Sequence, residues 1–392
     1  MEICKNVYWT GILDPNLKKF DIILDTKAGS TYNSYLIKGS NKIAVVDSAK
    51  HGFEEEFIGN IKKHISDLAK IDYIIVNHTE PDHSAAMVQL LELAPNAVVY
   101  ASKPAIKFLT AIVNKPFESA EVTENIELDL GGKTLSFIKA PFLHWPDTIF
   151  TYLKEDQILF TCDAFGAHYC NEKMFDDLCP DYMDEAFYYY DMIVRPFKAK
   201  VLQAVDKVVA SGIGIKCICP SHGPILRSDP MKMVKKYVEW SQPLVSEAKQ
   251  TILIMYLSAH GNTMQMAERI SKSFKDEEVV LIDIAESNMI EIRNELEKAK
   301  ALIVGCPTIL GDAPYPLWEA IAHIPTVAKN IKVAAAFGSY GWSGEAVPRI
   351  TSRLKDLRLK VIDPGLKINF VATDNDNKSI EDFVTSIIGE LN

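Results

Sequence analysis

The order of apolar and polar positions divides the chain into two parts, which differ in how predicted strands and helices follow one another. In the first 245 or so residues, short β-rich runs mix with turn signals and amphipathic helices. The strands that we predict there are 33–37, 43–46, 71–76, 134–138, 149–153, 158–161 and 216–219, and helical spacing covers 84–93 and 201–210. This mixture predicts an α+β domain.

The second part alternates strand and helix regularly from Thr251 onward. Its predicted strands are 251–257, 279–284, 301–304, 332–337 and about 367–371, with amphipathic helices between them and a last helix near 380–391. Five such units predict an α/β domain with a parallel, doubly wound sheet. We therefore expect two domains, residues 1–248 and 249–392, which meet in the polar stretch 246–250.

Composition and charge exclude several classes of protein. The 392 residues carry a net charge of −10, so electrostatics favours neither nucleic acid nor an anionic membrane as a partner. The sequence shows no apolar run of about 18 residues, and the Met1 end shows no basic stretch before an apolar run. We therefore expect a cytoplasmic protein without a membrane span or a secretory signal. The seven cysteines form no CxxC pair, which argues against a disulfide framework, a zinc ribbon or a rubredoxin-type iron site.

Four short segments concentrate metal-binding side chains, and each follows a predicted strand or extended segment. They are 77–83, 143–147, 160–163 and 220–223, and they hold four of the nine histidines. Side chains at the carboxyl ends of strands converge at one edge of a sheet, where α/β folds place their sites. Four histidines beside three carboxylates therefore indicate a metal site rather than isolated structural histidines.

The residue types predict two metal ions that share one carboxylate. The residues expected around the first ion are His78, Glu80, His144 and Asp163. Those expected around the second are Asp82, His83, His222 and a bridging oxygen of Asp163. Three carboxylates and a bridging hydroxide balance the charge of two ferrous ions. Mixed imidazole and carboxylate ligands suit iron or manganese, whereas a set richer in imidazole favours zinc.

Three loops of the second part predict a flavin site. The first is Ser258-Ala259-His260-Gly261-Asn262-Thr263, whose small and hydroxylated residues can close round a phosphate at a helix N-terminus. Because no Walker lysine and no G-x-G-x-x-G pattern is present, FMN fits better than ATP, GTP or a dinucleotide. The loops 305–311 and 337–344 add the expected flavin contacts Pro307, Thr308, Ile309, Leu310, Gly311, Ser339, Tyr340, Gly341, Trp342 and Gly344. Trp342 either stacks on the flavin or packs internally, and the sequence leaves this open.

The metal segments resemble a known superfamily. His-x-Glu-x-Asp-His at 78–83, with the later His144, Asp163 and His222, resembles the metallo-β-lactamase pattern His-x-His-x-Asp-His. Glu80 stands where the zinc hydrolases usually carry histidine, and this change is typical of the flavodiiron branch. The segments 144–147, 163–168 and 220–223 also resemble that branch, and the resemblance covers essentially the whole chain.

The resemblance implies a fold and a set of site residues. The fold is an N-terminal metallo-β-lactamase-like αββα sandwich followed by a C-terminal flavodoxin-like doubly wound sheet. The metal ligands fall at the seven positions given above, although family members differ in whether the imidazole at His83 reaches the metal. The resemblance also implies that His168 orients a ligand or the substrate, and that one tyrosine of 188–190 lies near the open side of the metals.

The implied function is an oxidoreductase that passes electrons from FMN to a diiron centre with a bridging hydroxide or oxo group. Reduced FMN and a diferrous centre hold two electrons each, which matches the four needed to reduce dioxygen to water; reduction of nitric oxide to nitrous oxide needs two. The expected electron donor is a rubredoxin, a flavin reductase or a deazaflavin coenzyme. The expected assembly is a head-to-tail homodimer or a dimer of dimers. A dizinc hydrolase with a fused flavodoxin domain and a non-catalytic electron carrier remain as alternatives.

Overall fold

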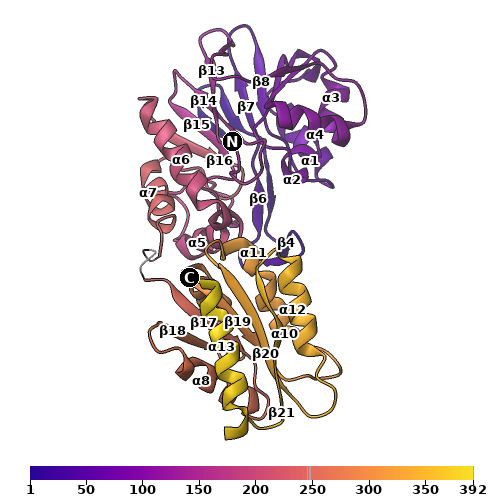
Figure 1. Ribbon diagram of the computed structural model, residues 1–392. Helices are drawn as coiled ribbons and strands as arrows, with labels where there is room; N and C mark the ends of the chain where they lie inside the picture. The colour runs from indigo at the N-terminus through magenta and orange to yellow at the C-terminus, as the bar shows by residue number, and fades with distance from the viewer. Residues whose placement is uncertain (245, 247–248, 392) are drawn as a thin grey trace. The chain divides into compact units, whose positions relative to one another are not determined.

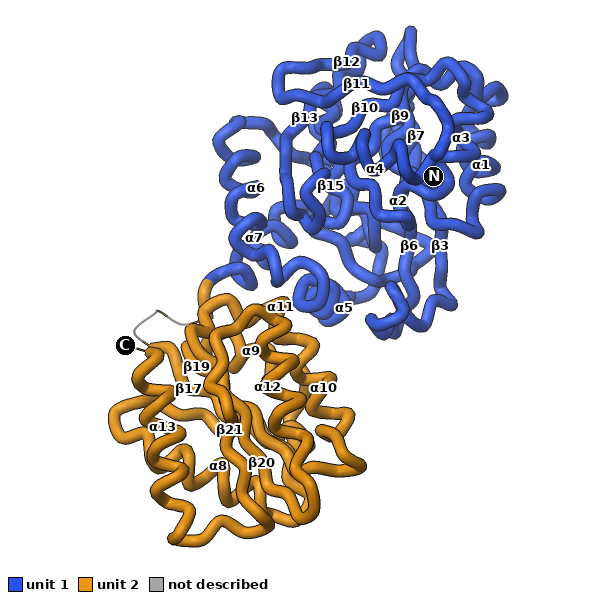
Figure 2. The backbone as a smooth tube through the Cα atoms, turned by 45° about the vertical axis from the view of Figure 1, so that its right-hand side comes forward, with its two compact units in different colours: residues 1–242 blue, residues 243–392 orange. Residues whose placement is uncertain are grey.

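The computed structural model describes residues 1–244, 246 and 249–391. It divides into two compact units, Met1–Gln242 and Pro243–Asn392, which are coloured separately in Figure 2. The boundary predicted from the sequence, residue 248, lies outside the described residues. None of the helices in the described part of the chain combines the length and apolar character of a membrane span.

The first unit contains two large sheets (Figure 1). One has the order β1-β2-β7-β8-β9-β10-β11, formed by Glu2–Cys4, Val7–Trp9, Tyr35–Lys38, Ile43–Val46, Tyr73–Val76, Val98–Ala101 and Ser119–Glu121. The other has the order β12-β13-β14-β15-β16, formed by Leu128–Asp129, Thr134–Lys139, Ile149–Leu153, Ile158–Cys162 and Cys217–Pro220. Two small pairs join β3 (Ile12–Asp14) to β6 (Ser30–Tyr32) and β4 (Lys19–Phe20) to β5 (Leu24–Asp25).

Alternation along the strands explains why the two sheets pack face to face. In β8, Val45 joins the apolar cluster beneath helices, whereas Ala44 and Val46 join the cluster shared with the second sheet. Helices cover the outer faces: α1 (Glu54–Lys62), α3 (Met87–Leu93) and α4 (Lys103–Val113) on the first sheet, and α5 (Met183–Tyr189), α6 (Lys198–Ala210) and α7 (Pro230–Trp240) on the second. The first unit is therefore an αββα sandwich, as expected.

The second unit is a parallel five-stranded sheet covered on both faces. Its order is β18-β17-β19-β20-β21, formed by Val279–Asp283, Thr251–Tyr256, Ala299–Gly305, Val333–Tyr340 and Val361–Asn369. Helices α8 (Asn262–Ser273) and α13 (Asn377–Leu391) pack on one face. Helices α9 (Met289–Lys298), α10 (Tyr315–Ala322), α11 (Ile324–Val327) and α12 (Ala346–Asp356) pack on the other. This is the flavodoxin-like order, and it confirms the doubly wound sheet predicted from the sequence.

Two predicted elements differ from those observed. The single helix predicted over 84–93 is two helices, α2 (Pro81–Ser84) and α3, because the Ala86 N–H bonds to the Ala49 carbonyl instead of continuing a helix. The last strand begins at Val361 rather than near residue 367. Pro364 lies within this strand, because β21 is at the edge of the sheet, where a residue without an N–H is tolerated.

Candidate metal centre and flavin site

The metal-binding segments meet at the ends of strands β9, β15 and β16 in the first unit. Asn77, which follows β9, is fixed by the buried Asp47 carboxylate: its backbone N–H bonds to Oδ1 at 2.7 Å and its amide to Oδ2 at 3.1 Å. Strand β15 ends in a register shift, and Cys162 adopts a left-handed φ of 49°. This bulge turns the chain so that the next side chain, Asp163, leaves the sheet at its edge.

The structure brings four of the predicted residues into a first group. These residues are His78, Glu80, His144 and Asp163, whose potential ligand atoms all lie within 4.8 Å of one another. Glu80 Oε2 lies 2.9 Å from His144 Nε2 and 3.4 Å from His78 Nε2. Asp163 contributes Oδ2, at 3.6 Å from each of the same two nitrogens. All four residues therefore surround one position.

A second group lies on the other side of the same carboxylate. It comprises Asp82, His83 and His222, again within 4.8 Å. The Asp82 oxygens lie 3.4 Å from His83 Nε2 and 3.2 Å from His222 Nε2. Asp163 now presents Oδ1, at 3.0 Å from His83 and 3.4 Å from His222. The two oxygens of Asp163 thus face different groups, which is the arrangement that a bridging ligand requires.

Burial and charge suit this double site to cations. Burial alone would lower the pKa of His222, but Asp163 and Asp82 raise the pKa to about 10. The pKa of His78 is also raised, because its carboxylate neighbours hold it well above the usual value in spite of burial. Burial would raise the pKa of Glu80, yet the neighbouring imidazoles of His144 and His78 lower it. A pocket that stabilises positive charge on buried imidazoles also stabilises bound metal ions.

Unpartnered polar atoms show that the groups fit metal ions. His78 Nε2 and both carboxylate oxygens of Asp82 are buried without a hydrogen-bond partner among the described residues. Such atoms are costly to bury unless a ligand satisfies them. The first group is also the more open one, since the side chains of Glu80 and His144 keep 13% and 16% exposure. The Asp82 and His222 side chains keep only 8% and 1%.

Residues outside the predicted set orient two of the imidazoles. Asp147 Oδ1 lies 3.1 Å from His78 Nδ1, and its Oδ2 accepts hydrogen bonds from the N–H and hydroxyl of Thr79. The Thr31 carbonyl accepts a hydrogen bond from His222 Nδ1 at 2.6 Å. Each contact leaves Nε2 free to face the metal position. His83 lacks such support, because its Nδ1 has no hydrogen-bond partner in the described part of the chain.

The three consecutive tyrosines separate into different roles. The hydroxyl of Tyr189, on α5, donates a hydrogen bond to Asp163 Oδ1 at 3.1 Å. The Tyr190 hydroxyl instead forms a hydrogen bond with the Ser241 hydroxyl. His168 lies with its ring centroid 4.8 Å from that of Tyr189 and 5.2 Å from that of His222, so it borders the second group.

In the second unit, the three predicted flavin loops follow the adjacent strands β17, β19 and β20. A hydrogen bond of 2.9 Å between the Thr263 and Ser339 hydroxyls ties the first loop to the third. The Thr308 N–H bonds to the Ser339 carbonyl, which ties the second loop to the third. The predicted residues of all three loops thus lie together at the carboxyl edge of the sheet.

The loops also offer suitable groups to an FMN molecule. Gly261 has a φ of 85° and precedes the 12-residue helix α8, and a side chain there would meet no atom within 4 Å. An open helix N-terminus beside Ser258 and Thr263 suits a phosphate. Trp342 is 96% exposed and Leu310 fully exposed, so Trp342 does not pack internally. These apolar surfaces are available to an aromatic ring system.

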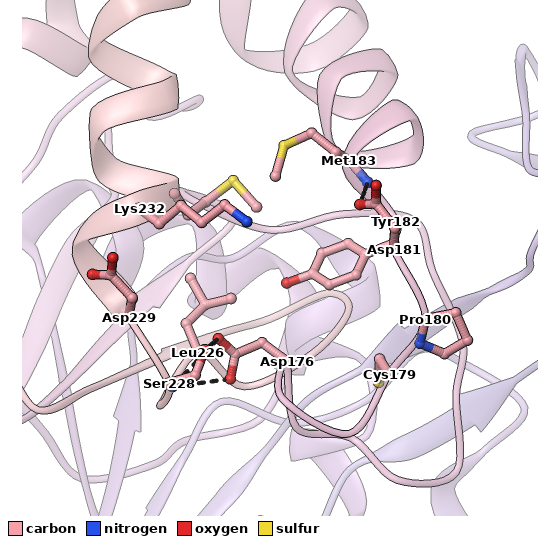
Figure 3. A pocket seen from close by; sticks show the side chains of 11 residues that line it. Asp176, Cys179, Pro180, Asp181, Tyr182, Met183, Leu226, Ser228, Asp229 and Lys232 are labelled. Atoms are coloured by element: carbon pink, nitrogen blue, oxygen red, sulfur yellow. Dashed lines mark hydrogen bonds between the residues drawn. The ribbon is translucent and has the colours of Figure 1, made fainter.

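A separate pocket in the first unit shares no residue with either candidate site (Figure 3). It has a volume of about 240 Å³ and lies between segments 176–183 and 226–233. Two of its carboxylates support local structure: Asp176 accepts hydrogen bonds from Ser228, and Asp181 accepts one from the Met183 N–H. We assign no ligand to it.

Comparison with known proteins agrees with both units. Residues 31–223 match the ODP family beta lactamase and residues 254–383 match the flavodoxin family. The chain is 40% identical to "Flavo-diiron protein FprA2" of Clostridium acetobutylicum, over 99% of both chains. It is 35% identical to "Nitric oxide reductase" of Moorella thermoacetica, over 95% of this chain and 94% of that protein.

The chain belongs to the flavodiiron proteins. A solved relative, the rubredoxin oxygen:oxidoreductase of Desulfovibrio gigas, shows the same fold, with a TM-score of 0.75 and 28% identity over 100% of this chain and 98% of that one. As a flavodiiron protein, the chain is an oxidoreductase with FMN and a diiron centre as its cofactors. The residues that hold these cofactors are inferred from the geometry above.

The contact between Asp147 and His78 generates a first prediction. Replacing Asp147 with alanine should lower iron affinity about 10- to 100-fold, because the imidazole loses the partner that fixes its orientation. Chelator competition on the purified chain measures this affinity. Asp206→Ala, the same change at an exposed position of α6, should leave iron affinity unchanged. Wild-type affinity in Asp147→Ala would contradict this role.

The phosphate loop generates a second prediction. Residues 249–392 expressed alone should fold and bind one FMN, and Ser258→Ala should weaken FMN binding roughly tenfold through loss of a hydrogen bond to a charged group. Fluorescence titration measures the affinity, with the exposed Ser352→Ala as the matched control. Recovery of FAD would contradict the loop assignment, because this unit has no second nucleotide-binding half.

Proposed function

We propose that this chain reduces dioxygen to water, with reduction of nitric oxide to nitrous oxide as a second activity. The observation that carries the proposal is the pair of buried groups that share Asp163, with Glu80 in the first group. When bound, reduced FMN and a diferrous centre supply two electrons each, and their sum matches the requirement of dioxygen. The names of the Moorella and Desulfovibrio relatives support the two substrates.

The chain's own residues position and shield this centre. We propose that His78, Glu80 and His144 hold the first iron, that Asp82, His83 and His222 hold the second, and that Asp163 bridges them. The 3.0 Å distance from His83 Nε2 to Asp163 Oδ1 supports His83 as a ligand. Burial of the second group limits access by bulk water, so substrate reaches the centre past the more exposed Glu80 and His144.

The hydrolase alternative fits the site less well. A dizinc hydrolase uses a metal hydroxide as its nucleophile. In the first group, Glu80 Oε2 lies 2.9 Å from His144 Nε2. With a glutamate at this place, the first group contains fewer imidazoles than the metal sites of zinc hydrolases usually do. Hydrolysis by a metal hydroxide also requires no electron transfer, so it does not explain the flavin loops. The other alternative, a non-catalytic electron carrier, does not explain why the first unit contains two groups of metal-binding residues.

The proposal extends to the electron donor and to the cellular location. The Desulfovibrio relative is named for rubredoxin, so we propose a small redox protein of that kind as donor, with a flavin reductase or a deazaflavin coenzyme as alternatives. We place the protein in the cytoplasm, because its seven cysteines are all free thiols, as suits a reducing compartment.

We further propose a head-to-tail homodimer in which the flavin of one subunit faces the irons of the other. Two-fold symmetry then makes two such contacts at once. Exposed apolar side chains support an interface on each unit. Ile22 and Ile23, on the hairpin next to Phe20, are 87% and 71% exposed, and the flavin loops expose Leu310 and Trp342. Large apolar groups of this kind mark contact surfaces. A dimer of dimers repeats the same contact.

Metal identity provides the third prediction. Protein purified without oxygen should contain close to two irons per chain, and Glu80→His should shift metal preference towards zinc and abolish reductase activity. Elemental analysis and oxygen consumption measure both effects. Glu92→His, at an exposed ion pair, should change neither. Stoichiometric zinc with hydrolytic turnover in the wild-type protein would overturn the oxidoreductase proposal.

Electron transfer between subunits provides the fourth prediction. A metal-deficient chain (His78→Ala with Asp163→Ala) and a flavin-deficient chain (changes at Ser258, Asn262 and Thr263) should each form inactive homodimers. Their differently tagged mixed dimer should regain up to about half the normal rate, because one of its two sites pairs an intact flavin with intact irons. An inactive mixed dimer that retains FMN and iron would show that transfer runs within one chain.

A further inference from the structure

The end of strand β21 contacts the third flavin loop, residues 337–344. Asn369 is the last residue of β21, and Phe370 follows it. Neither residue was among the flavin contacts expected from the sequence. In the pairing of β20 with β21, Asn369 lies opposite Tyr340, where the third flavin loop leaves its strand. A fourth segment of the second unit thus meets the loops assigned to FMN.

This segment satisfies two consecutive carbonyls of the third flavin loop. The Tyr340 carbonyl accepts the Phe370 N–H at 2.9 Å and the side-chain amide of Asn369, through Nδ2, at 3.1 Å. The same Nδ2 donates to the Gly341 carbonyl at 3.4 Å. The carbonyl that precedes these two is bonded to the second flavin loop. Three carbonyls in a row are therefore occupied by the protein itself.

The N–H groups that follow these carbonyls are left unused. Those of Trp342, Ser343 and Gly344 donate to no carbonyl of the described residues. Gly344 has a φ of 76°, and a side chain there would lie only 2.9 Å from Cγ of Tyr340. A turn that contains such a left-handed residue directs successive N–H groups to one side, where they can bind electron-rich groups. The loop thus offers donors, and not acceptors, to a ligand.

Phe370 packs against the same loop. Its φ of 52° lies in the left-handed region, which residues other than glycine adopt rarely. A side chain at position 341 would lie 2.6 Å from Cζ of Phe370, so the phenyl ring fills the space beside Gly341. The packing of this ring and the hydrogen bonds of Asn369 together leave the loop little freedom to reverse its peptide groups.

The order of acceptors and donors matters to a flavin because reduction adds electron density to the ring. Aligned N–H groups stabilise that density, whereas a carbonyl oxygen turned towards the ring would oppose it. We propose that Asn369 is a positioning residue of the flavin site. By holding the carbonyls of Tyr340 and Gly341, it leaves only N–H donors to FMN and so favours binding of the reduced form. This inference rests on the assignment of the third flavin loop to FMN.

The reduction potential of FMN in the full-length, FMN-loaded protein tests the proposal. Asn369→Ala removes the amide, and Asn369→Asp keeps its size but cannot donate. Each should weaken binding of reduced FMN about tenfold more than binding of oxidised FMN, which lowers the two-electron potential by about 30 mV. Asn369→Gln keeps an amide donor and should retain most of the wild-type potential. Asn375→Ala, at an exposed position of the same unit, should leave the potential unchanged.

Two results of this titration would overturn the proposal. One is an unchanged potential in Asn369→Ala and Asn369→Asp while both retain FMN. The other is an equal loss of affinity for oxidised and reduced FMN, because Asn369 would then only stabilise the loop. A Ser258→Ala variant with wild-type FMN affinity would instead count against the assignment of the flavin loops, and not against the role of Asn369.

A further measurement requires no substitution, and it decides the question if the variants fail to fold. Hydrogen exchange of the full chain, followed by mass spectrometry of fragments that cover residues 341–345, compares protein without FMN, with oxidised FMN and with reduced FMN. We expect exchange at 342–344 to slow at least about tenfold when FMN binds, and to slow further on reduction. Exchange that is as fast with reduced FMN as without FMN would overturn the proposal.

Discussion

The arrangement of the candidate metal ligands depends on the Asp163 carboxylate, whose two oxygens face two different groups of these residues. Oδ2 faces His78 and His144, and Oδ1 faces His83 and His222. Four imidazoles from distant parts of the chain can lie this close together, largely buried, only because carboxylates offset their desolvation. The bulge at Cys162 and the hydrogen bond from Tyr189 place this carboxylate at the sheet edge.

Hydrogen bonds from neighbouring residues fix the imidazoles and the backbone around the Asp163 carboxylate. Asp147 and the Thr31 carbonyl engage the Nδ1 atoms of two imidazoles, which turns Nε2 of each towards the centre. The Asp47 carboxylate fixes the backbone at Asn77, from which the His-x-Glu-x-Asp-His segment starts. Rigid placement of the ligands matches the demands of a redox centre, because the protein supplies orientation and exclusion of water while the cofactors supply the electrons.

The sequence was informative where the signal is local. Strands β8 and β14 were predicted with their observed bounds, because their apolar runs are flanked by clear turns. The seven metal-binding candidates could be proposed from the sequence because they cluster at strand ends, and the structure brings them together in two adjoining groups. Ser30 and Thr31 could not be, since they reach His222 across more than 190 residues of sequence and sit in no motif of their own. Asp147 lay within a predicted segment, but its role depends on a hydrogen bond to His78 across 69 residues.

The most direct test of a shared carboxylate is the magnetic coupling of the two irons. Ferric ions joined by a bridging carboxylate and a bridging hydroxide or oxo group couple antiferromagnetically, whereas isolated ferric ions give a strong high-spin signal. We predict that oxidised protein with two irons per chain is silent in conventional EPR and that partial reduction produces a mixed-valence signal. Oxidised protein with full iron content and the signal of isolated high-spin ferric ions would contradict the account of Asp163.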